Sequence, residues 1–271
     1  MVATPSPHVI TWQKLPDDFP LPDDPVDNIA QPAIAAALTE SLRLANRLPT
    51  DAFTCTNYGI CATLNGKMVV KAPDWAYIPR ITVTRDEINR SYTPQLQGDI
   101  PAIVLEFLSE TEGTEYSIKS TYPPGKFFFY EQILHVPNYG IFDPKTGVLE
   151  LYRQGNHAAP YRLQSPDSQG RVWIPELDLF LGPWQGQWEN LQGHWLRWWD
   201  AAGNLLLWGP ERVALEEQRA AQERERAGRE RERAERERER AERERERAER
   251  ERERAERLLA QLRAAGLEPE D

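Results

Sequence analysis

The pattern of apolar and polar positions first indicates a helix over residues 28–46. Asn28, a residue type that caps helix N-termini, stands at its start. The apolar side chains that follow recur three or four residues apart and would share one face: Ile34, Leu38, Leu42 and Ala45. We therefore expect an amphipathic helix capped by Asn28.

Short strands are expected next, over residues 53–64, 67–72, 74–83 and 102–108. Asn65-Gly66 separates the first two strands and favours the tight turn of a hairpin. Residues 85–99 have no usable pattern and predict a loop with a turn of helix. The run Ala102–Leu105 is continuously apolar, so the strand that contains it should be buried on both faces.

A second helix is expected between Pro123-Pro124, which suit a first helical turn, and Pro137, which ends it. Lys126 would share a face of this helix with Phe129, Tyr130 and Ile133. Further strands are expected over residues 138–142, 148–153, 161–163 and 171–174.

Residues 182–208 hold six of the nine tryptophans. Alternation in residues 195–199, a turn at residues 200–204 and an apolar run at residues 205–208 predict a hairpin. Tryptophans stack on unpaired bases in some proteins, but we favour the interpretation that these cover a small sheet.

The C-terminal part has a seven-residue period, with alanine at 227, 234, 241, 248 and 255 and alternating Glu and Arg between. The inserted alanine makes most i,i+4 pairs opposite in charge, as for Glu239 and Arg243. The pattern predicts one long helix. The positions where two such helices would meet hold alanine and charged residues until Leu258, Leu259 and Leu262. We therefore expect a lone helix or a weak coiled coil. Pairing of two copies through the leucine-rich end is a hypothesis.

Together these patterns predict an α/β protein with a mixed sheet flanked by helices. We expect four parts: an extended Pro/Asp-rich leader (1–27), an α/β core (28–180), a Trp-rich β-hairpin extension (181–209) and a charged heptad helix (210–271).

Charge limits the function classes. The net charge is −10, and residues 211–271 hold 20 acidic and 18 basic side chains, which leaves 23 acidic and 15 basic ones in residues 1–210. An acidic body argues against broad non-specific binding of nucleic acid. Cys55 and Cys61 form no disulfide framework and, with four scattered histidines, no zinc site. No signal segment or membrane span is apparent, so we expect a cytoplasmic protein.

Candidate chemistry begins with Glu106, a carboxylate in line with the buried strand, where an unpaired charge is costly. Asp74 stands at the start of another strand. These two carboxylates and the Phe107 carbonyl are oxygen donors of the kind that Mg²⁺ prefers. Lys126 lies in a first helical turn, where the helix dipole disfavours a cation, so another group should hold it there.

A structural interpretation of the same residues is equally open at this point. Asp74 would cap a turn, Glu106 would end a strand at the surface, and Lys126 would be solvated. Glu40, in the first helix, is expected to be a solvated carboxylate, with a role as a third metal ligand as the alternative. Glu131 and His135 are expected to be helix-surface residues.

Four short motifs occur in this order: Pro73-Asp74, Glu106-Phe-Leu-Ser109, Lys126 with Tyr130-Glu131, and Phe142-Asp143-Pro144. Together they resemble the putative restriction endonuclease family of the PD-(D/E)xK nuclease superfamily. That family was once catalogued as a domain of unknown function. The similarity covers about residues 28–210, and the leucine-rich end of the tail is similar to that of some members.

The resemblance implies a restriction-endonuclease-like fold, Asp74 and Glu106 as metal ligands and Lys126 as the catalytic lysine. The superfamily's lysine commonly stands two residues after the acid, where this chain has Leu108, but in the family resembled it has moved to the next helix. The segment before Lys126 is longer than usual, and Lys119 competes for the role.

These observations favour a Mg²⁺-dependent (or Mn²⁺-dependent) endonuclease that hydrolyses DNA phosphodiester bonds. The alternative is a non-catalytic interaction protein that keeps the nuclease scaffold and acts through its C-terminal helix, and the acidic body favours it.

Overall fold

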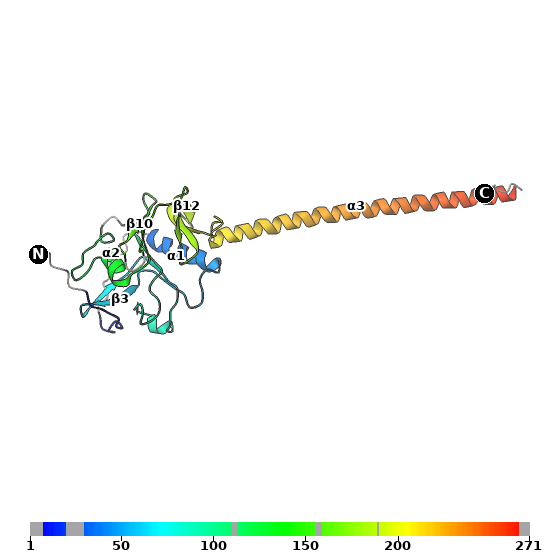
Figure 1. Cartoon of the computed structure of the whole chain (residues 1–271). Helices are drawn as coiled ribbons and strands as arrows, with labels where there is room; N and C mark the ends of the chain where they lie inside the picture. Colours follow the sequence, from blue (N-terminus) through cyan, green and yellow to red (C-terminus); the bar gives the residue numbers. More distant parts are fainter. Residues whose placement is uncertain (1–7, 20–29, 110–112, 156–158, 189, 266–271) are drawn as a thin grey trace. The chain divides into compact units, whose positions relative to one another are not determined.

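The computed structural model describes residues 8–19, 30–109, 113–155, 159–188 and 190–265 (Figure 1). The chain forms two compact units, residues 1–209 and 210–271. The finer division of the first unit into leader, core and extension stays a prediction. Asn28, the expected helix cap, lies outside the described residues.

Helix α1 (Ala30–Leu44) confirms the first amphipathic helix. Its periodic apolar side chains Ile34, Leu38 and Leu42 are all fully buried. Ser41 donates its hydroxyl to the carbonyls of Ala37 and Leu38, so this polar residue on the buried face is satisfied within the helix.

A six-stranded mixed sheet forms the centre of the first unit, in the order β10-β9-β8-β7-β5-β2. Its strands are β2 (Phe53–Cys55), β5 (Trp75–Ile78), β7 (Ile103–Phe107), β8 (Asn138–Asp143), β9 (Val148–Arg153) and β10 (Arg162–Leu163). β7 and β8 run parallel, and the other neighbours are antiparallel. The expected buried strand is therefore a central one, with β5 on one side and β8 on the other.

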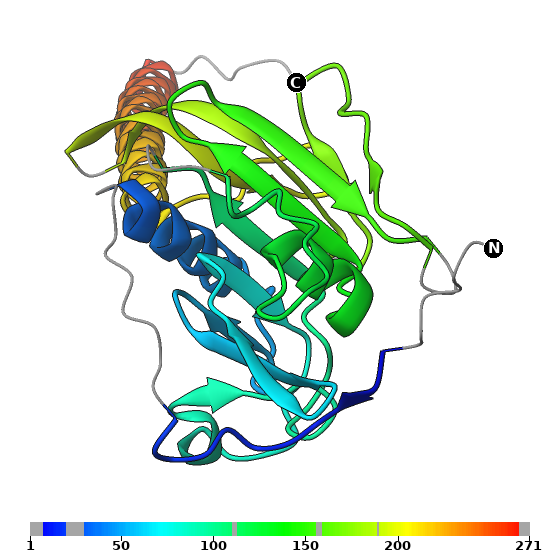
Figure 2. The same ribbon diagram turned by 90° about the vertical axis from the view of Figure 1, so that its left-hand side faces the viewer.

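Both faces of this sheet are covered, which explains the continuous apolar run in β7. One face packs on α1 and on a three-stranded antiparallel sheet of β11 (Val172–Ile174), β12 (Leu179–Trp188) and β13 (Leu191–Trp199). The other face packs on α2 (Lys126–Phe128) and on the π-helical segment η2 (Phe129–Leu134), as Figure 2 shows for α2 in green.

A smaller sheet is built on β3 (Gly59–Leu64), which pairs with β1 (Ile10–Thr11), β4 (Lys67–Lys71) and β6 (Ser91–Tyr92). The Asn65-Gly66 hairpin between β3 and β4 is confirmed. The expected single strand over residues 53–64 is wrong, because Asn57 has φ 46 and divides it into β2 and β3, which join different sheets. The predicted turn of helix in residues 85–99 is η1 (Asp86–Ile88).

The expected helix between Pro123-Pro124 and Pro137 is present but is not a regular α-helix. One α-helical turn, α2, continues directly as η2, and the N–H groups of His135 and Val136 both donate to the Tyr130 carbonyl. Positions four residues apart lie close to one face in an α-helix and in a π-helix, so the Lys126–Tyr130 and Phe129–Ile133 spacings did not distinguish the two.

The predicted hairpin of residues 195–208 is confirmed only at its turn, where the Asp200 N–H donates to the Asn204 carbonyl and the Leu206 N–H to the Trp198 carbonyl, both at 2.9 Å; the long partner of β13 is another strand. β13 pairs along its whole length with β12, and residues 205–208 contribute a single bridge, from Leu205 to Trp199. The covering role of the tryptophans is confirmed: Trp195, Trp198 and Trp208 are buried in the core beside α1.

The second unit contains α3 (Gly209–Ala264), one continuous helix of 56 residues, as the heptad pattern predicted. None of the residues of α3 is buried. Ion pairs four residues apart recur along it, such as Arg243–Glu239 at 3.1 Å and Arg250–Glu246 at 2.9 Å. None of the described helices is long and apolar enough to cross a membrane.

Candidate active site

Glu106 owes its position to the alternation of side chains along β7. Ile103, Leu105 and Phe107 face α1, while Val104 lies in the core on the side of η2. Glu106 shares the side of Val104, because successive strand residues point to opposite faces. Its side chain is 0% exposed, so a carboxylate lies in the core at the end of a central strand.

Two donors from the next helix satisfy this carboxylate. Lys126 Nζ donates to Glu106 Oε2 at 2.9 Å, and the Tyr130 hydroxyl donates to Oε1 at 3.2 Å. Lys126 and Tyr130 are four residues apart, so one helical face presents both groups. The sequence pattern placed Lys126 on this apolar face, and the buried carboxylate is the group that holds it there.

Gly125 fixes where this helix starts. A Cβ at Gly125 would lie 2.1 Å from the Ser117 carbonyl oxygen, so a larger residue would push the two backbones apart. The same carbonyl accepts the Phe128 N–H at 3.3 Å. The backbone at Ser117 thus contacts Gly125 and the first turn of α2, and these contacts fix the position of Lys126 relative to the core.

Asp74 joins the site from the neighbouring strand. It immediately precedes β5, in which Trp75 is paired with Leu105, so Asp74 lies at the level of Glu106. Asp74 Oδ2 accepts the Phe107 N–H at 2.6 Å, and the Phe107 carbonyl accepts the Gln31 side-chain amide at 2.8 Å. The predicted residues Asp74, Glu106, Phe107 and Lys126 are therefore brought together by the ends of β5 and β7 and the start of α2.

Glu115 is a fourth charged residue at this site, and no sequence pattern pointed to it. It belongs to a polar segment without periodicity. Its Oε1 lies 3.9 Å from Lys126 Nζ, and its side chain is only 13% exposed. One ammonium thus faces the carboxylates of Glu106 and Glu115, with Asp74 close enough to interact with it.

The pKa values of the site follow from this arrangement. Burial raises the pKa of Glu106 to about 8, an effect that Lys126 opposes and that Asp74 and Glu115 reinforce. Burial also raises the pKa of Asp74, against the stabilising Phe107 N–H. For Lys126, burial lowers the pKa, but the carboxylates of Glu106, Asp74 and Glu115 outweigh it, so the net shift is upward. The acids are pushed toward their neutral forms while Lys126 keeps its proton.

The donor set fits magnesium. Two carboxylates and a main-chain carbonyl are hard oxygen ligands, and Mg²⁺ in proteins usually keeps several waters and takes only one or two carboxylates. If all three carboxyl groups were ionised, one ammonium would leave an excess of negative charge that a divalent cation would neutralise, and this repulsion contributes to the raised pKa values of Glu106 and Asp74. Among residues 8–265, where described, no three His, Cys, Asp or Glu side chains are grouped to hold a metal ion on their own.

The remaining candidates lie elsewhere. The Lys119 side chain is exposed, and Glu40 accepts the Gly209 N–H at 3.3 Å. Glu131 accepts the Tyr161 N–H at 2.6 Å, while His135 ends η2 in the left-handed conformation. Cys55 and Cys61 are free and buried, and burial raises the pKa of their thiols to about 12 and about 11.

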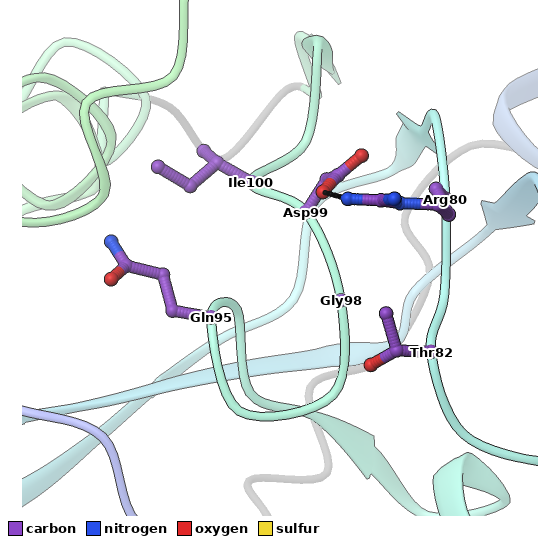
Figure 3. Close-up of a pocket in the computed structure, with 6 residues that line it drawn as sticks. All are labelled: Arg80, Thr82, Gln95, Gly98, Asp99 and Ile100. Carbon is purple, nitrogen blue, oxygen red and sulfur yellow. Dashed lines mark hydrogen bonds and ion pairs between the residues drawn. The ribbon is translucent and has the colours of Figure 1, made fainter.

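A surface pocket of about 390 Å³ is separate from this site. Figure 3 shows its lining residues, Arg80, Thr82, Gln95, Gly98, Asp99 and Ile100, with the Arg80–Asp99 ion pair at 3.1 Å. Asp99 and Ile100 precede β7, whereas Glu106 lies near its other end, so the pocket and the candidate site occupy opposite ends of the strand.

The part of the chain that matches a known protein family lies within the first unit. No curated protein matches the chain. The crystal structure of a putative nuclease belonging to DUF820 from Anabaena variabilis ATCC 29413 is similar at 14% sequence identity and a TM-score of 0.36, over 58% of this chain and 76% of that chain. The model of the Uma2 family, described as putative restriction endonuclease, matches residues 22–185. This match spans more than half of the chain, which therefore belongs to the Uma2 putative restriction endonuclease family.

Proposed function

We propose that this protein is a metal-dependent endonuclease that hydrolyses DNA phosphodiester bonds at Asp74, Glu106 and Lys126. The observation that carries the proposal is the buried Glu106–Lys126 pair, 2.9 Å apart, beside Asp74 at the ends of two adjacent strands. A buried carboxylate paired with a lysine costs desolvation free energy that a purely apolar core would avoid. Its presence in a chain of this family favours a chemical role.

In this proposal Asp74, Glu106 and the Phe107 carbonyl would hold Mg²⁺, with Mn²⁺ as a substitute. When bound, the metal supplies stabilisation of the attacking and leaving oxygens of the phosphodiester. Lys126 would orient the attacking water and stabilise its hydroxide form, because its raised pKa keeps it a cation at neutral pH. Tyr130 would hold Glu106 in place through Oε1. The enzyme would act in the cytoplasm, where the thiols of Cys55 and Cys61 stay reduced.

The test is cleavage of plasmid and linear DNA by the full chain, with Mg²⁺, with Mn²⁺ and with EDTA. Asp74→Asn and Glu106→Gln keep side-chain shape and should abolish metal-dependent cleavage. Asp86→Asn, at an exposed position in η1, is the matched control and should cleave as the wild type does. Cleavage that persists in Asp74→Asn would overturn the assignment of the site.

The alternative, a non-catalytic interaction protein acting through α3, is favoured by the net charge of −8 in residues 1–210 and by a helix with no buried residue. A chain shortened to residues 1–209 separates the two functions. If it cleaves DNA as the full chain does, the tail is an accessory and the enzyme proposal stands.

A further inference from the structure

Residues 113–125, which lie between β7 and α2, expose an unusual amount of apolar surface. Seven large apolar side chains are exposed in the described part of residues 8–209, and three of them lie within residues 116–122. These are Tyr116, Ile118 and Tyr122, at 40%, 73% and 48% exposure. Single exposed apolar residues need no explanation, but a cluster of them marks an interaction surface.

This loop is held in a defined conformation by hydrogen bonds to its neighbours. The Tyr122 hydroxyl donates to the Met68 carbonyl at 3.1 Å, and the Tyr139 hydroxyl donates to the Glu115 carbonyl at 2.9 Å. Within the loop, the Gly125 N–H donates to the Lys119 carbonyl at 2.9 Å. The three apolar side chains are therefore presented on a fixed backbone, which lowers the entropic cost of binding a partner.

Two exposed lysines lie at this segment. Lys119 is exposed, and Lys67 Nζ lies 5.0 Å from the centre of the Tyr122 ring. Glu115 turns inward to Lys126, so its carboxylate leaves the outer surface. Burial raises the pKa of the Tyr116 hydroxyl, and the carboxylates of Glu150 on β9, Glu115 and Asp143 raise it further. An outward lysine beside an exposed aromatic ring, as at Tyr122, is a combination that binds single-stranded nucleic acid, with a base stacked on the ring and the cation near a phosphate.

The position of the loop links this surface to the candidate active site. The loop follows the strand that carries Glu106 and ends at the helix that carries Lys126. We infer that residues 116–122 form the substrate-strand surface of the enzyme, on which Tyr116 and Tyr122 stack unpaired bases of a DNA strand and Lys67 and Lys119 contact its phosphates. The inference rests on the proposed function, which it deepens by naming single-stranded or locally unpaired DNA as the substrate class.

The experiment measures binding of the full chain to a fluorescently labelled single-stranded oligodeoxynucleotide of about 20 nucleotides by anisotropy. The matched duplex and an RNA of the same sequence are compared, in EDTA and in Ca²⁺. The DNA single strand should bind at least about tenfold more tightly than the duplex. Tyr116→Ala and Tyr122→Ala should each weaken single-strand binding about fivefold or more, the lower range for loss of one stacked base.

Matched variants separate stacking from structure. Tyr116→Phe and Tyr122→Phe keep the rings and should bind within about twofold of wild type, even though Tyr122→Phe loses the bond to Met68. Leu163→Ala removes an apolar side chain from β10 that is 59% exposed, more than either tyrosine, and should leave single-strand binding unchanged. Lys119→Ala should lower the salt dependence of binding by about the amount that one phosphate contact contributes.

The proposal is overturned if the duplex or the RNA binds as tightly as the DNA single strand in both conditions, or if the alanine and phenylalanine variants behave alike. Either result would assign the apolar loop to another partner, such as a protein. Cleavage is scored separately: ring-dependent binding without cleavage supports the surface and rejects the proposed enzyme. Duplex cleavage that is indifferent to both tyrosines supports the enzyme and rejects the surface.

Discussion

Lys126 Nζ lies 2.9 Å from Glu106 Oε2, although the two residues are 20 positions apart and Glu106 is fully buried. A cation in the first turn of a helix costs a few tenths of a kcal/mol, roughly, through the helix dipole. The buried carboxylate outweighs this cost, since leaving it unpaired would be worse by about 3–5 kcal/mol. The pair therefore explains both anomalies, the acid in the strand and the lysine in the helix.

The first prediction concerns the pH dependence of stability. The pKa of Glu106 is raised from 4.5 to about 8, so the native state keeps a proton that the unfolded state releases. This contribution to stability is fully present below pH 4.5 and is lost as the pH rises to about 8, by at most about 1.4 kcal/mol per pH unit. Glu106→Gln cannot titrate, so its stability relative to wild type should improve between pH 5 and pH 8.

Urea unfolding of both proteins across this range measures the effect. Parallel curves for the two proteins would mean that Glu106 has the same charge in the native and unfolded states, contrary to the burial argument.

How far the sequence predicts this site depends on what each residue's neighbours along the chain reveal. Glu106 and Lys126 were identifiable because each violates a local rule, a charge in an apolar run and a cation at a helix start. Glu115 breaks no such rule, because it lies in a polar segment, and its contact with Lys126 exists only in three dimensions. Gln31 was hidden for the same reason, since a helix-start amide gives no sign that it bonds the Phe107 carbonyl.

The sequence pattern missed β12 as the long partner of β13, and the reason is packing. β12 contains Gly182, Pro183 and Gly186, residues that usually interrupt strands. A Cβ at Gly182 would lie 2.8 Å from the Arg171 side chain, and one at Gly186 would lie 2.0 Å from the Trp184 ring. Gly182 makes room for the Arg171 side chain next to β11, and Gly186 for the Trp184 ring of β12 itself. These contacts are not visible in the local sequence pattern.

The second prediction tests Tyr130 as a positioning residue. Tyr130→Phe removes the hydroxyl that donates to Glu106 Oε1 and should lower the free energy of unfolding by about 1–3 kcal/mol. It should also slow cleavage, because Glu106 loses one of its two restraints. Tyr139→Phe is the control: that hydroxyl donates to the Glu115 main-chain carbonyl, so stability should fall while cleavage changes less. An equal loss of cleavage in both would reduce Tyr130 to a general packing role.

The third prediction concerns the two lysines. Lys126→Ala should leave metal binding nearly intact but reduce the cleavage rate at saturating DNA about 100-fold or more, as for loss of a group that stabilises charge in the transition state. Lys119→Ala should hardly change that rate, because its side chain is exposed. Reversed results would place the catalytic lysine in the loop.

The fourth prediction is stabilisation by metal. A ligand bound only by the native state stabilises it by about 2.7 kcal/mol at a concentration 100 times its Kd. Millimolar Mg²⁺ or Mn²⁺ should therefore raise the melting temperature. Asp74→Asn should abolish the shift with little loss of stability without metal, because the asparagine oxygen can still accept the Phe107 N–H. A melting curve unmoved by either metal would count against the metal site.

The last prediction concerns the tail and bears on the choice between the two functions. An all-polar helix has no face to bury and is held by ion pairs that contribute about 0.2–0.5 kcal/mol each. Pairs such as Arg226–Glu230 and Arg252–Glu256 are largely exposed, so salt should screen them. A peptide of residues 210–271 should be helical at low salt, lose helicity as salt rises, and show no dependence on peptide concentration, since a seam of alanine and charged residues pairs weakly.

Circular dichroism over salt and concentration measures both properties. The control peptide replaces Leu258, Leu259 and Leu262, the exposed apolar side chains at the end of α3, by alanine. If helicity of the natural peptide depends on concentration but not on salt, and the control loses this dependence, the leucine-rich end pairs two copies. That result would favour the interaction-protein hypothesis over the nuclease hypothesis, because pairing would explain why α3 extends for 56 residues without a buried side chain.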